Sequence, residues 1–254
     1  SVVASNITGT SARAMLGALV AGERDTVVMA DLAMSRMRRK IPDLQEALTG
    51  RFDDHHALIV GQLLTRLAQT EAALADLDAA IAEAMTPWAH ELELLQTIPG
   101  IGLRTAQVFI AETGGDMSRF PTAKHLAAWV GVAPAIHESA GKRTPAGTRH
   151  GNKFLTSMLV EAANSAARSK RTYLAAQFAR IASRRGHSRA AMAVAHSMLV
   201  AAYHMLVRDE PYHDLGPTWL DEHARTQAST RRLVAQLERL GHTVVLDPKA
   251  NPAA

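Results

Sequence analysis

The chain has 254 residues, no cysteine and a formal net charge of +4. This length allows one large domain or two small ones, and the lack of cysteine excludes disulfides and thiolate metal sites. Hydrophobic residues make up 47% of the chain but aromatic residues only 4%, a balance typical of helical cores. We find no apolar run of the roughly 18 residues that a membrane span needs and no signal peptide. We therefore expect a cytoplasmic protein without a membrane partner.

Residues 1–50 are expected to form an N-terminal helical segment. Apolar residues recur at spacings of three and four in residues 11–21 and 26–37, which is the pattern of helices. Pro42 then interrupts the chain, and Asp43 followed by Glu46 is typical of the start of another helix.

Residues 51–91 are expected to form one long coiled-coil helix. Steps of three and four alternate without interruption along a stripe of nine positions: Val60, Leu63, Leu67, Thr70, Leu74, Leu77, Ile81, Ala84 and Trp88. A period of 3.5 residues held over four heptads is typical of a coiled coil. We predict a helix of more than 30 residues whose stripe packs against a second chain, so that the protein is a homo-oligomer through residues 60–88. A long core helix within one chain is the alternative.

Residues 99–102 read Pro-Gly-Ile-Gly and separate an apolar helix end from a new helix. This segment resembles a helix-hairpin-helix motif, in which glycine allows a positive φ and a close approach to a sugar-phosphate chain. The second helix would present free N–H groups and a cation to a phosphate. Gly100, Gly102, Arg104 and Thr105 are therefore candidate nucleic-acid-binding residues. A tight turn that contacts only protein is the alternative.

Positive charge is concentrated between residues 131 and 190. Eleven lysines and arginines stand there against two acidic residues, an excess of nine positive charges. Such a one-sided field is typical of a protein with a polyanionic partner, most often nucleic acid, although solvated helix faces are the alternative. Residues 139–153 form a glycine-broken basic loop in this segment, and its candidate nucleic-acid contacts are Lys142, Arg143, Arg149, Asn152 and Lys153.

Residues 92–254 are expected to form a C-terminal domain made of helices. Helical patterns cover residues 123–130, 153–169, 172–184, 189–207 and 230–240. Residues 243–246, Thr-Val-Val-Leu, are predicted to form a short C-terminal strand. The expected fold class is all-α: a long coiled-coil helix, then a helical domain with a helix-hairpin-helix-like motif and that strand.

Several segments together resemble one known family, the transposases of the insertion-sequence 110, 116 and 902 group. The resemblance covers essentially the whole chain and rests on the order and spacing of short motifs rather than on any one of them. These motifs are Pro99-Gly100-Ile101-Gly102, Phe120-Pro121-Thr122-Ala123, Leu126-Ala127-Ala128-Trp129-Val130-Gly131, Glu138-Ser139-Ala140-Gly141-Lys142, Gly151-Asn152-Lys153-Phe154-Leu155, Val194-Ala195-His196-Ser197 and Tyr212-His213-Asp214-Leu215-Gly216.

The resemblance implies three parts: an N-terminal RuvC-like nuclease domain with four acidic metal ligands, a coiled coil, and a C-terminal transposase domain with a nucleophilic serine. This sequence matches the last two, so we expect the chain to be an incomplete protein. Ser139 is then the expected catalytic residue, DNA the expected partner, and a structured guide RNA a further implied partner. Mg²⁺ is expected in the missing nuclease domain, and no cofactor or metal site in this chain. Thr156 stands where the family usually has arginine.

Three functions of different classes remain open from the sequence. The first is the DNA-binding and strand-exchange portion of a transposase, inactive as this fragment alone. The second is a non-catalytic helix-hairpin-helix module in which Ser139 only contacts phosphate. The third is a helical scaffold that oligomerises through residues 60–88.

Overall fold

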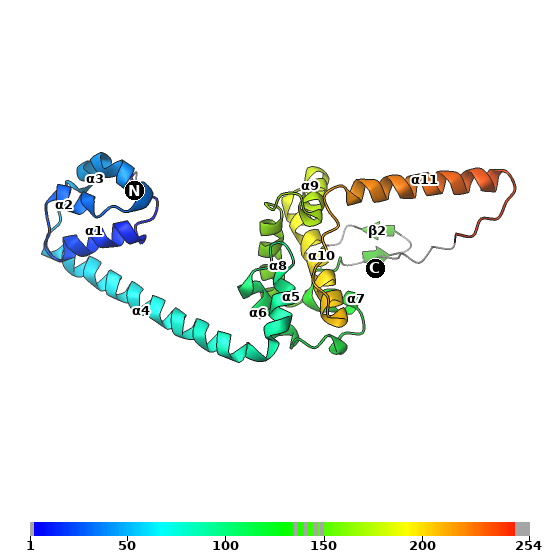
Figure 1. The fold of residues 1–254 in the computed structure, drawn as a ribbon, viewed down its shortest axis with the longest axis horizontal. Helices are drawn as coiled ribbons and strands as arrows, with labels where there is room; N and C mark the ends of the chain where they lie inside the picture. The colour runs from blue at the N-terminus through cyan, green and yellow to red at the C-terminus, as the bar shows by residue number, and fades with distance from the viewer. Residues whose placement is uncertain (1–2, 135–136, 140–141, 145–146, 148–149, 247–254) are drawn as a thin grey trace. The chain divides into compact units, whose positions relative to one another are not determined.

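The computed structural model of the chain describes residues 3–134, 137–139, 142–144, 147 and 150–246. The chain divides into two compact units, Ser1–Ala84 and Met85–Ala254, and each is described by itself (Figure 1). Helices account for most of the described residues in both units, which confirms the all-α prediction.

The first unit is a small helical bundle that ends in one long helix. Its elements are α1 (Thr10–Val20), α2 (Thr26–Asp31), the 3-10 helix η1 (Ser35–Lys40), α3 (Ile41–Leu48) and α4 (Asp54–Ala84). Met15, Ala30 and Leu44 form its core. The helix α1 runs antiparallel to α4. Near the start of α1, Nη1 of Arg13 donates to Oε2 of Glu71 at 2.7 Å, whereas Val20 at the end of α1 lies against Gly61, ten residues earlier in α4.

The helix α4 is the long helix that the heptad stripe predicted, with 31 residues. None of its residues is buried within this chain, which contradicts the alternative of a long core helix. Leu74 and Leu77 of the stripe are 55% and 60% exposed. The described part of the chain thus supplies no cover for these leucines, and the oligomer through residues 60–88 stays a prediction.

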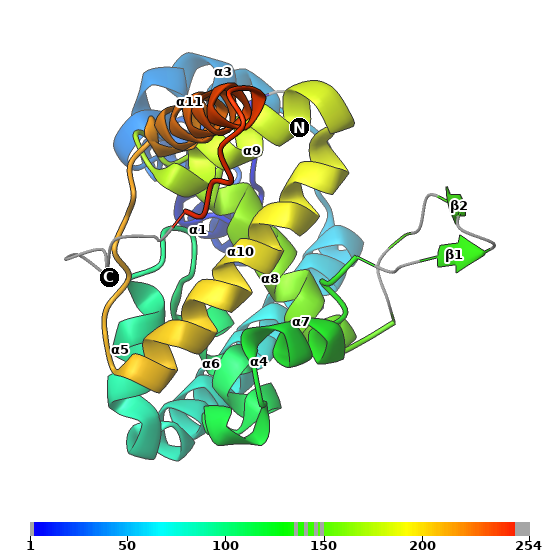
Figure 2. The same ribbon diagram turned by 90° about the vertical axis from the view of Figure 1, so that its right-hand side faces the viewer.

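The second unit is a globular bundle with one short hairpin. Its elements are η2 (Thr86–Trp88), α5 (Ala89–Gln96), α6 (Leu103–Thr113), η3 (Met117–Arg119), α7 (Ala123–Val130), β1 (His137–Ser139), β2 (Lys142–Thr144), α8 (Lys153–Ala166), α9 (Tyr173–Arg185), α10 (His187–Arg208) and α11 (Trp219–Arg239). The helix α10 lies at the centre and packs against α5, α7, α8 and α9 (Figure 2).

Small side chains allow close packing around α10. Ala190, Ala191, Ala195 and Ala202 are buried on this helix, together with larger residues such as Leu199. The helix has the length and mean hydropathy, 1.6, of a membrane span, but half of its apolar window is buried against the other helices. That burial is what the core helix of a globular unit shows.

The predicted C-terminal strand at residues 243–246 is wrong. These residues form no strand, and Val245 and Leu246 are 86% and 61% exposed. A strand needs a neighbour for its backbone hydrogen bonds, and no described strand pairs with this segment. The described strands lie instead at residues 137–139 and 142–144, where the sequence predicted a loop.

The turn between α5 and α6 is fitted against α8. Gly100 has a φ of +94°, and a Cβ placed on it would lie 2.3 Å from the carbonyl oxygen of Ala162 and 2.8 Å from the backbone nitrogen of Ala166. Gly102, the N-cap of α6, has an ordinary φ of −98° and open space where a Cβ would stand. The two glycines of the motif therefore meet different constraints.

We predict that Gly100→Ala destabilises the protein strongly and that Gly102→Ala does not. Left-handed strain and overpacking against α8 together cost about 2–5 kcal/mol in the free energy of unfolding. The matched change at Gly102 costs roughly 1 kcal/mol or less, the loss at a helix N-cap. Urea denaturation followed by circular dichroism measures both, and equal losses in the two variants would contradict the packing argument.

Candidate nucleic-acid interface

The hairpin β1–β2 carries the candidate nucleophile. The strands are antiparallel, and their register pairs His137 with Thr144, Glu138 with Arg143, and Ser139 with Lys142. Opposed residues in such a ladder have Cα atoms about 4.5–5.5 Å apart. The backbone therefore places Ser139 beside Lys142 at the turn end of a hairpin that extends away from α7 and α8 (Figure 2).

The base of this hairpin is closed by a backbone contact between α7 and α8. A Cβ on Gly151 would lie 2.3 Å from the carbonyl carbon and oxygen of Val130. The helix α7 ends there because Gly131 has a φ of +90° and serves as its C-cap. Only glycine, which has no Cβ, lets the chain at position 151 pass so close to the backbone of Val130.

Two polar residues strengthen this closure. Asn152 is the N-cap of α8: its Oδ1 accepts a hydrogen bond from the Leu155 N–H at 3.0 Å, and its amide donates to the Glu112 carboxylate of α6. Thr156 donates its hydroxyl to the Val130 carbonyl oxygen at 2.8 Å. The half-buried Asn152 thus links α6 to α8, and Thr156 links α8 to the end of α7.

The first turn of α8 exposes a cation and an aromatic ring. Lys153 is the first residue of α8, and Phe154 beside it is 75% exposed. A cation is unfavourable near the positive end of a helix dipole. No described carboxylate forms an ion pair with Lys153. The arrangement favours an external anion at this surface.

Some residues of the helix-hairpin-helix-like segment pack against the protein, and others lie on its surface. Gly100 is blocked by α8, and Thr105 is only 7% exposed. Gly102 faces open space and Arg104 is exposed at the start of α6. Of the four predicted contacts, Gly102 and Arg104 are therefore the ones that the fold leaves on the surface.

A large cavity lies at the foot of the hairpin, and we call it the hairpin-foot cavity. Its volume is about 960 Å³. It is lined by Val132, Pro134, Gly147, Gln177, Arg185, Ser188, Arg189, Met192, Ala193, His196 and Ser197. Pro134 precedes β1 and Gly147 follows β2, so both ends of the hairpin meet α9 and α10 here.

The partly buried Gln177 side chain in this cavity has a buried oxygen without a hydrogen-bond partner. The Gln177 side chain donates through Nε2 to the Ser197 hydroxyl at 2.9 Å, and that hydroxyl donates to the Ala193 carbonyl oxygen at 3.2 Å. Oε1 of Gln177 is buried and has no hydrogen-bond partner within the described structure. A buried acceptor without a partner is costly and is uncommon in folded proteins.

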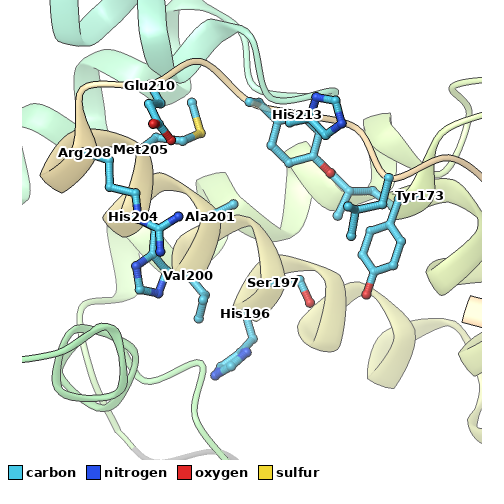
Figure 3. A pocket seen from close by; sticks show the side chains of 13 residues that line it. Tyr173, His196, Ser197, Val200, Ala201, His204, Met205, Arg208, Glu210 and His213 are labelled. Atoms are coloured by element: carbon cyan, nitrogen blue, oxygen red, sulfur yellow. The ribbon is translucent and has the colours of Figure 1, made fainter. Parts of the chain in front are cut away.

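A second cavity of about 470 Å³ adjoins the first and shares His196 and Ser197 with it (Figure 3). His196, Val200 and His204 follow one another at four-residue steps along α10 (Figure 3). Burial lowers the pKa of His196, which favours its neutral form, able both to donate and to accept a hydrogen bond. Nearby, burial raises the pKa of Tyr212 well above its ordinary value and keeps the phenol protonated.

The predicted site residues are thus distributed over three places. Ser139, Lys142 and Arg143 are on the hairpin, and Lys153 is on the surface near its base. Gly102 and Arg104 are at the start of α6, whereas Gly100, Thr105 and Asn152 are engaged in packing. Arg149 and the exposure of the Ser139 hydroxyl lie outside the described part of the structure. No sequence signal pointed to Gln177, because an isolated glutamine in an amphipathic helix is ordinary.

Known proteins with similar sequences are named for insertion elements, for transposases and for gene inversion. The family model described as "Transposase IS116/IS110/IS902 family" matches residues 92–180. An insertion element IS110 protein of Streptomyces coelicolor is 31% identical over 209 residues, which cover 76% of this chain and 49% of the relative. The transposase for insertion sequence element IS1111A of Coxiella burnetii is 27% identical over 158 residues, or 61% of this chain and 43% of the relative.

A shorter match is to a protein named for gene inversion. The pilin gene-inverting protein of Moraxella bovis is 48% identical over 50 residues, which are 20% of this chain and 15% of that protein. The chain spans about half the length of the two insertion-element relatives above. Residues 92–180 therefore match the IS116/IS110/IS902 transposase family, and the chain as a whole is similar to proteins of insertion elements.

Proposed function

We propose that this chain is the DNA-binding and strand-exchange portion of a transposase, and that Ser139 is its nucleophile. The observation that carries the proposal is the hairpin, whose register sets Ser139 opposite Lys142 within a strongly basic segment of a transposase-family domain. Relatives named for transposition and for gene inversion support it, because both processes require DNA strands to be cut and rejoined.

The proposed chemistry is transfer of a phosphodiester to serine and back to DNA. The Ser139 hydroxyl loses its proton and attacks phosphorus; a P–O bond to serine forms, the bond to one sugar oxygen breaks, and that oxygen leaves as a hydroxyl. The hydroxyl of another strand then attacks the phosphoserine and releases Ser139. Each step exchanges one phosphoester for another, so no high-energy cofactor is consumed.

The nearby cations would stabilise the charge of the transferring phosphate. A free serine hydroxyl is a weak nucleophile and needs activation by a base, a cation or a metal. Lys142, Arg143 and Lys153 supply positive charge around the hairpin, and such preorganised charge is an effective form of catalysis. Lys142 is the cation whose backbone lies beside Ser139.

The Mg²⁺ that the family implies is not assigned to residues of this chain. The described residues contain no group of three or more His, Asp or Glu side chains arranged to hold a metal ion. The contribution that we propose for this chain is to bind the strand and to present the serine.

The proposal also includes the segments of the chain, its partners and its self-association. We propose three segments, with residues 1–50 as an N-terminal helical segment, 51–91 as a coiled coil and 92–254 as the transposase domain. We also propose cytoplasmic DNA as the substrate, a structured guide RNA as a further partner, and self-association through residues 60–88. The Leu74 and Leu77 side chains, which the chain itself leaves exposed, support the last point.

We predict that the chain binds duplex DNA mainly through charge. Reversing Arg149 and Lys153 to Glu together should weaken binding of every sequence. The slope of log affinity against log salt should fall by about 0.9 for each phosphate that the variant no longer neutralises. Fluorescence anisotropy at several salt concentrations measures this. The control reverses Arg231 and Arg232 of α11, with the same change in net charge. Equal effects of both pairs, or affinity independent of salt, would count against a localised DNA surface.

We predict that Ser139→Ala abolishes strand exchange and leaves DNA affinity nearly unchanged. The hydroxyl is needed for bond exchange, whereas the cations supply affinity. The assay joins the chain to the acidic nuclease domain that the family implies, supplies Mg²⁺, and follows recombinant DNA and the covalent protein–DNA adduct by electrophoresis. Ser183→Ala, at an exposed serine of α9, is the control. Recombination by Ser139→Ala at the unmodified rate would eliminate the assignment.

We predict that Leu74→Asp combined with Leu77→Asp dissociates the oligomer. Two carboxylates in the apolar stripe of a coiled coil cannot be buried without a large desolvation cost. Analytical ultracentrifugation measures the loss of the dimer or higher species. Ala75→Asp combined with Ala79→Asp adds the same charge outside the stripe and should leave the assembly intact. A monomeric unmodified chain at micromolar concentration would rule out this interface.

A further inference from the structure

We propose that the hairpin-foot cavity receives one unstacked nucleotide of a single DNA strand, next to the phosphodiester that the hairpin addresses. This inference rests on the proposed function and names the part of the substrate that α9 and α10 hold.

The cavity has the size and lining that a nucleotide needs. Its volume of about 960 Å³ is at the upper end of the range for small-molecule sites. Val132, Pro134, Met192 and Ala193 give it apolar walls. A base taken out of its stack needs such surfaces on its faces, and methionine is well suited because its polarizable sulfur packs favourably against aromatic rings.

The polar wall of the cavity contains an acceptor, the Gln177 side-chain oxygen, that a hydrogen-bond donor on a ligand would satisfy. Gln177 uses its amide N–H on Ser197, and its Oε1 is left without a partner. Every DNA base carries an N–H group on its pairing edge, which unstacking exposes. A small rotation of the Gln177 side chain would let Oε1 accept from that edge, so that the ligand satisfies the acceptor that the fold leaves unpaired.

The charge of the lining favours a phosphate at the cavity's edge. Arg185 and Arg189 are exposed, and no described residue forms an ion pair with either. None of the described residues that line the cavity is acidic. Two guanidinium groups beside an apolar chamber match a nucleotide, in which an anionic phosphate is joined to a flat base.

The position of the cavity connects it to the reaction. Pro134 and Gly147 line the cavity and flank β1 and β2, so the chamber lies where the hairpin joins the helices. A strand with one nucleotide in the chamber would continue toward the hairpin with its neighbouring phosphate. Holding that nucleotide fixes the strand against Ser139, as positioning of a reacting group requires.

The first arm of the test compares two strands on the unmodified chain. A fluorescein-labelled oligodeoxythymidine and a strand of the same length built entirely from abasic tetrahydrofuran nucleotides carry the same phosphates. We expect the abasic strand to bind roughly tenfold more weakly, the effect of losing one stacked base. Fluorescence anisotropy at low salt measures both affinities.

The second arm assigns the difference to the cavity. Ala193→Phe fills the chamber and Gln177→Leu removes the acceptor, and each should shrink the difference between the two strands. Arg185→Gln with Arg189→Gln should weaken oligodeoxythymidine roughly tenfold through loss of charged hydrogen bonds. Arg184→Gln with Arg231→Gln removes the same charge elsewhere and should change affinity much less.

The outcomes separate this inference from the proposed function. Salt-dependent binding with equal affinity for both strands overturns the nucleotide site and leaves the DNA-binding proposal standing. A base-dependent difference that survives in both Ala193→Phe and Gln177→Leu places the base elsewhere and also overturns it. Tighter binding of oligouridine RNA than of oligodeoxythymidine would make RNA the occupant instead. No binding of either single strand overturns the nucleotide site, and no binding of duplex DNA as well overturns both proposals.

Discussion

The hairpin depends on a place where two backbones touch. Gly151 passes over the carbonyl of Val130 with no room for a Cβ, and Gly131 ends α7 beneath it. This crossing brings together the two ends of the connection that carries the paired strands β1 and β2. The hydrogen bonds of Asn152 and Thr156 fix the crossing from the side of α8. The proposed nucleophile, Ser139, stands on this hairpin.

The same helix, α8, also shapes the other motif of the domain. Its backbone at Ala162 and Ala166 lies against Gly100, so the turn between α5 and α6 packs on protein where a DNA-binding hairpin would leave the first glycine free. The start of α6 remains exposed at Gly102 and Arg104. One motif thus contributes both to the core and to the surface, and the division follows from the close approach of α6 and α8.

The positive charge of residues 131–190 is spread over several elements. Part of it is on the hairpin, part at the start of α8, and part at the end of α9 and the start of α10, where Arg185 and Arg189 border the hairpin-foot cavity. These cations are far apart in sequence but lie near one another in the fold, because the hairpin begins and ends beside α9 and α10. A nucleic acid strand bound along these elements would meet cations on each of them.

The sequence by itself determined the helical fold, the long α4 and the positions of most helices, because spacing, glycine and proline are local signals that the chain carries with it. It also indicated the family and the basic segment around Ser139. Only the tertiary structure decided which glycines pack and which face solvent, that residues 137–139 pair with residues 142–144 as strands, and that residues 243–246 form no strand. Strand pairing and cavities depend on neighbours distant in sequence. The hairpin-foot cavity forms because α9, α10 and the ends of the hairpin lie together, which brings Gln177, Arg185 and Pro134 to one place. No local sequence pattern predicts that contact.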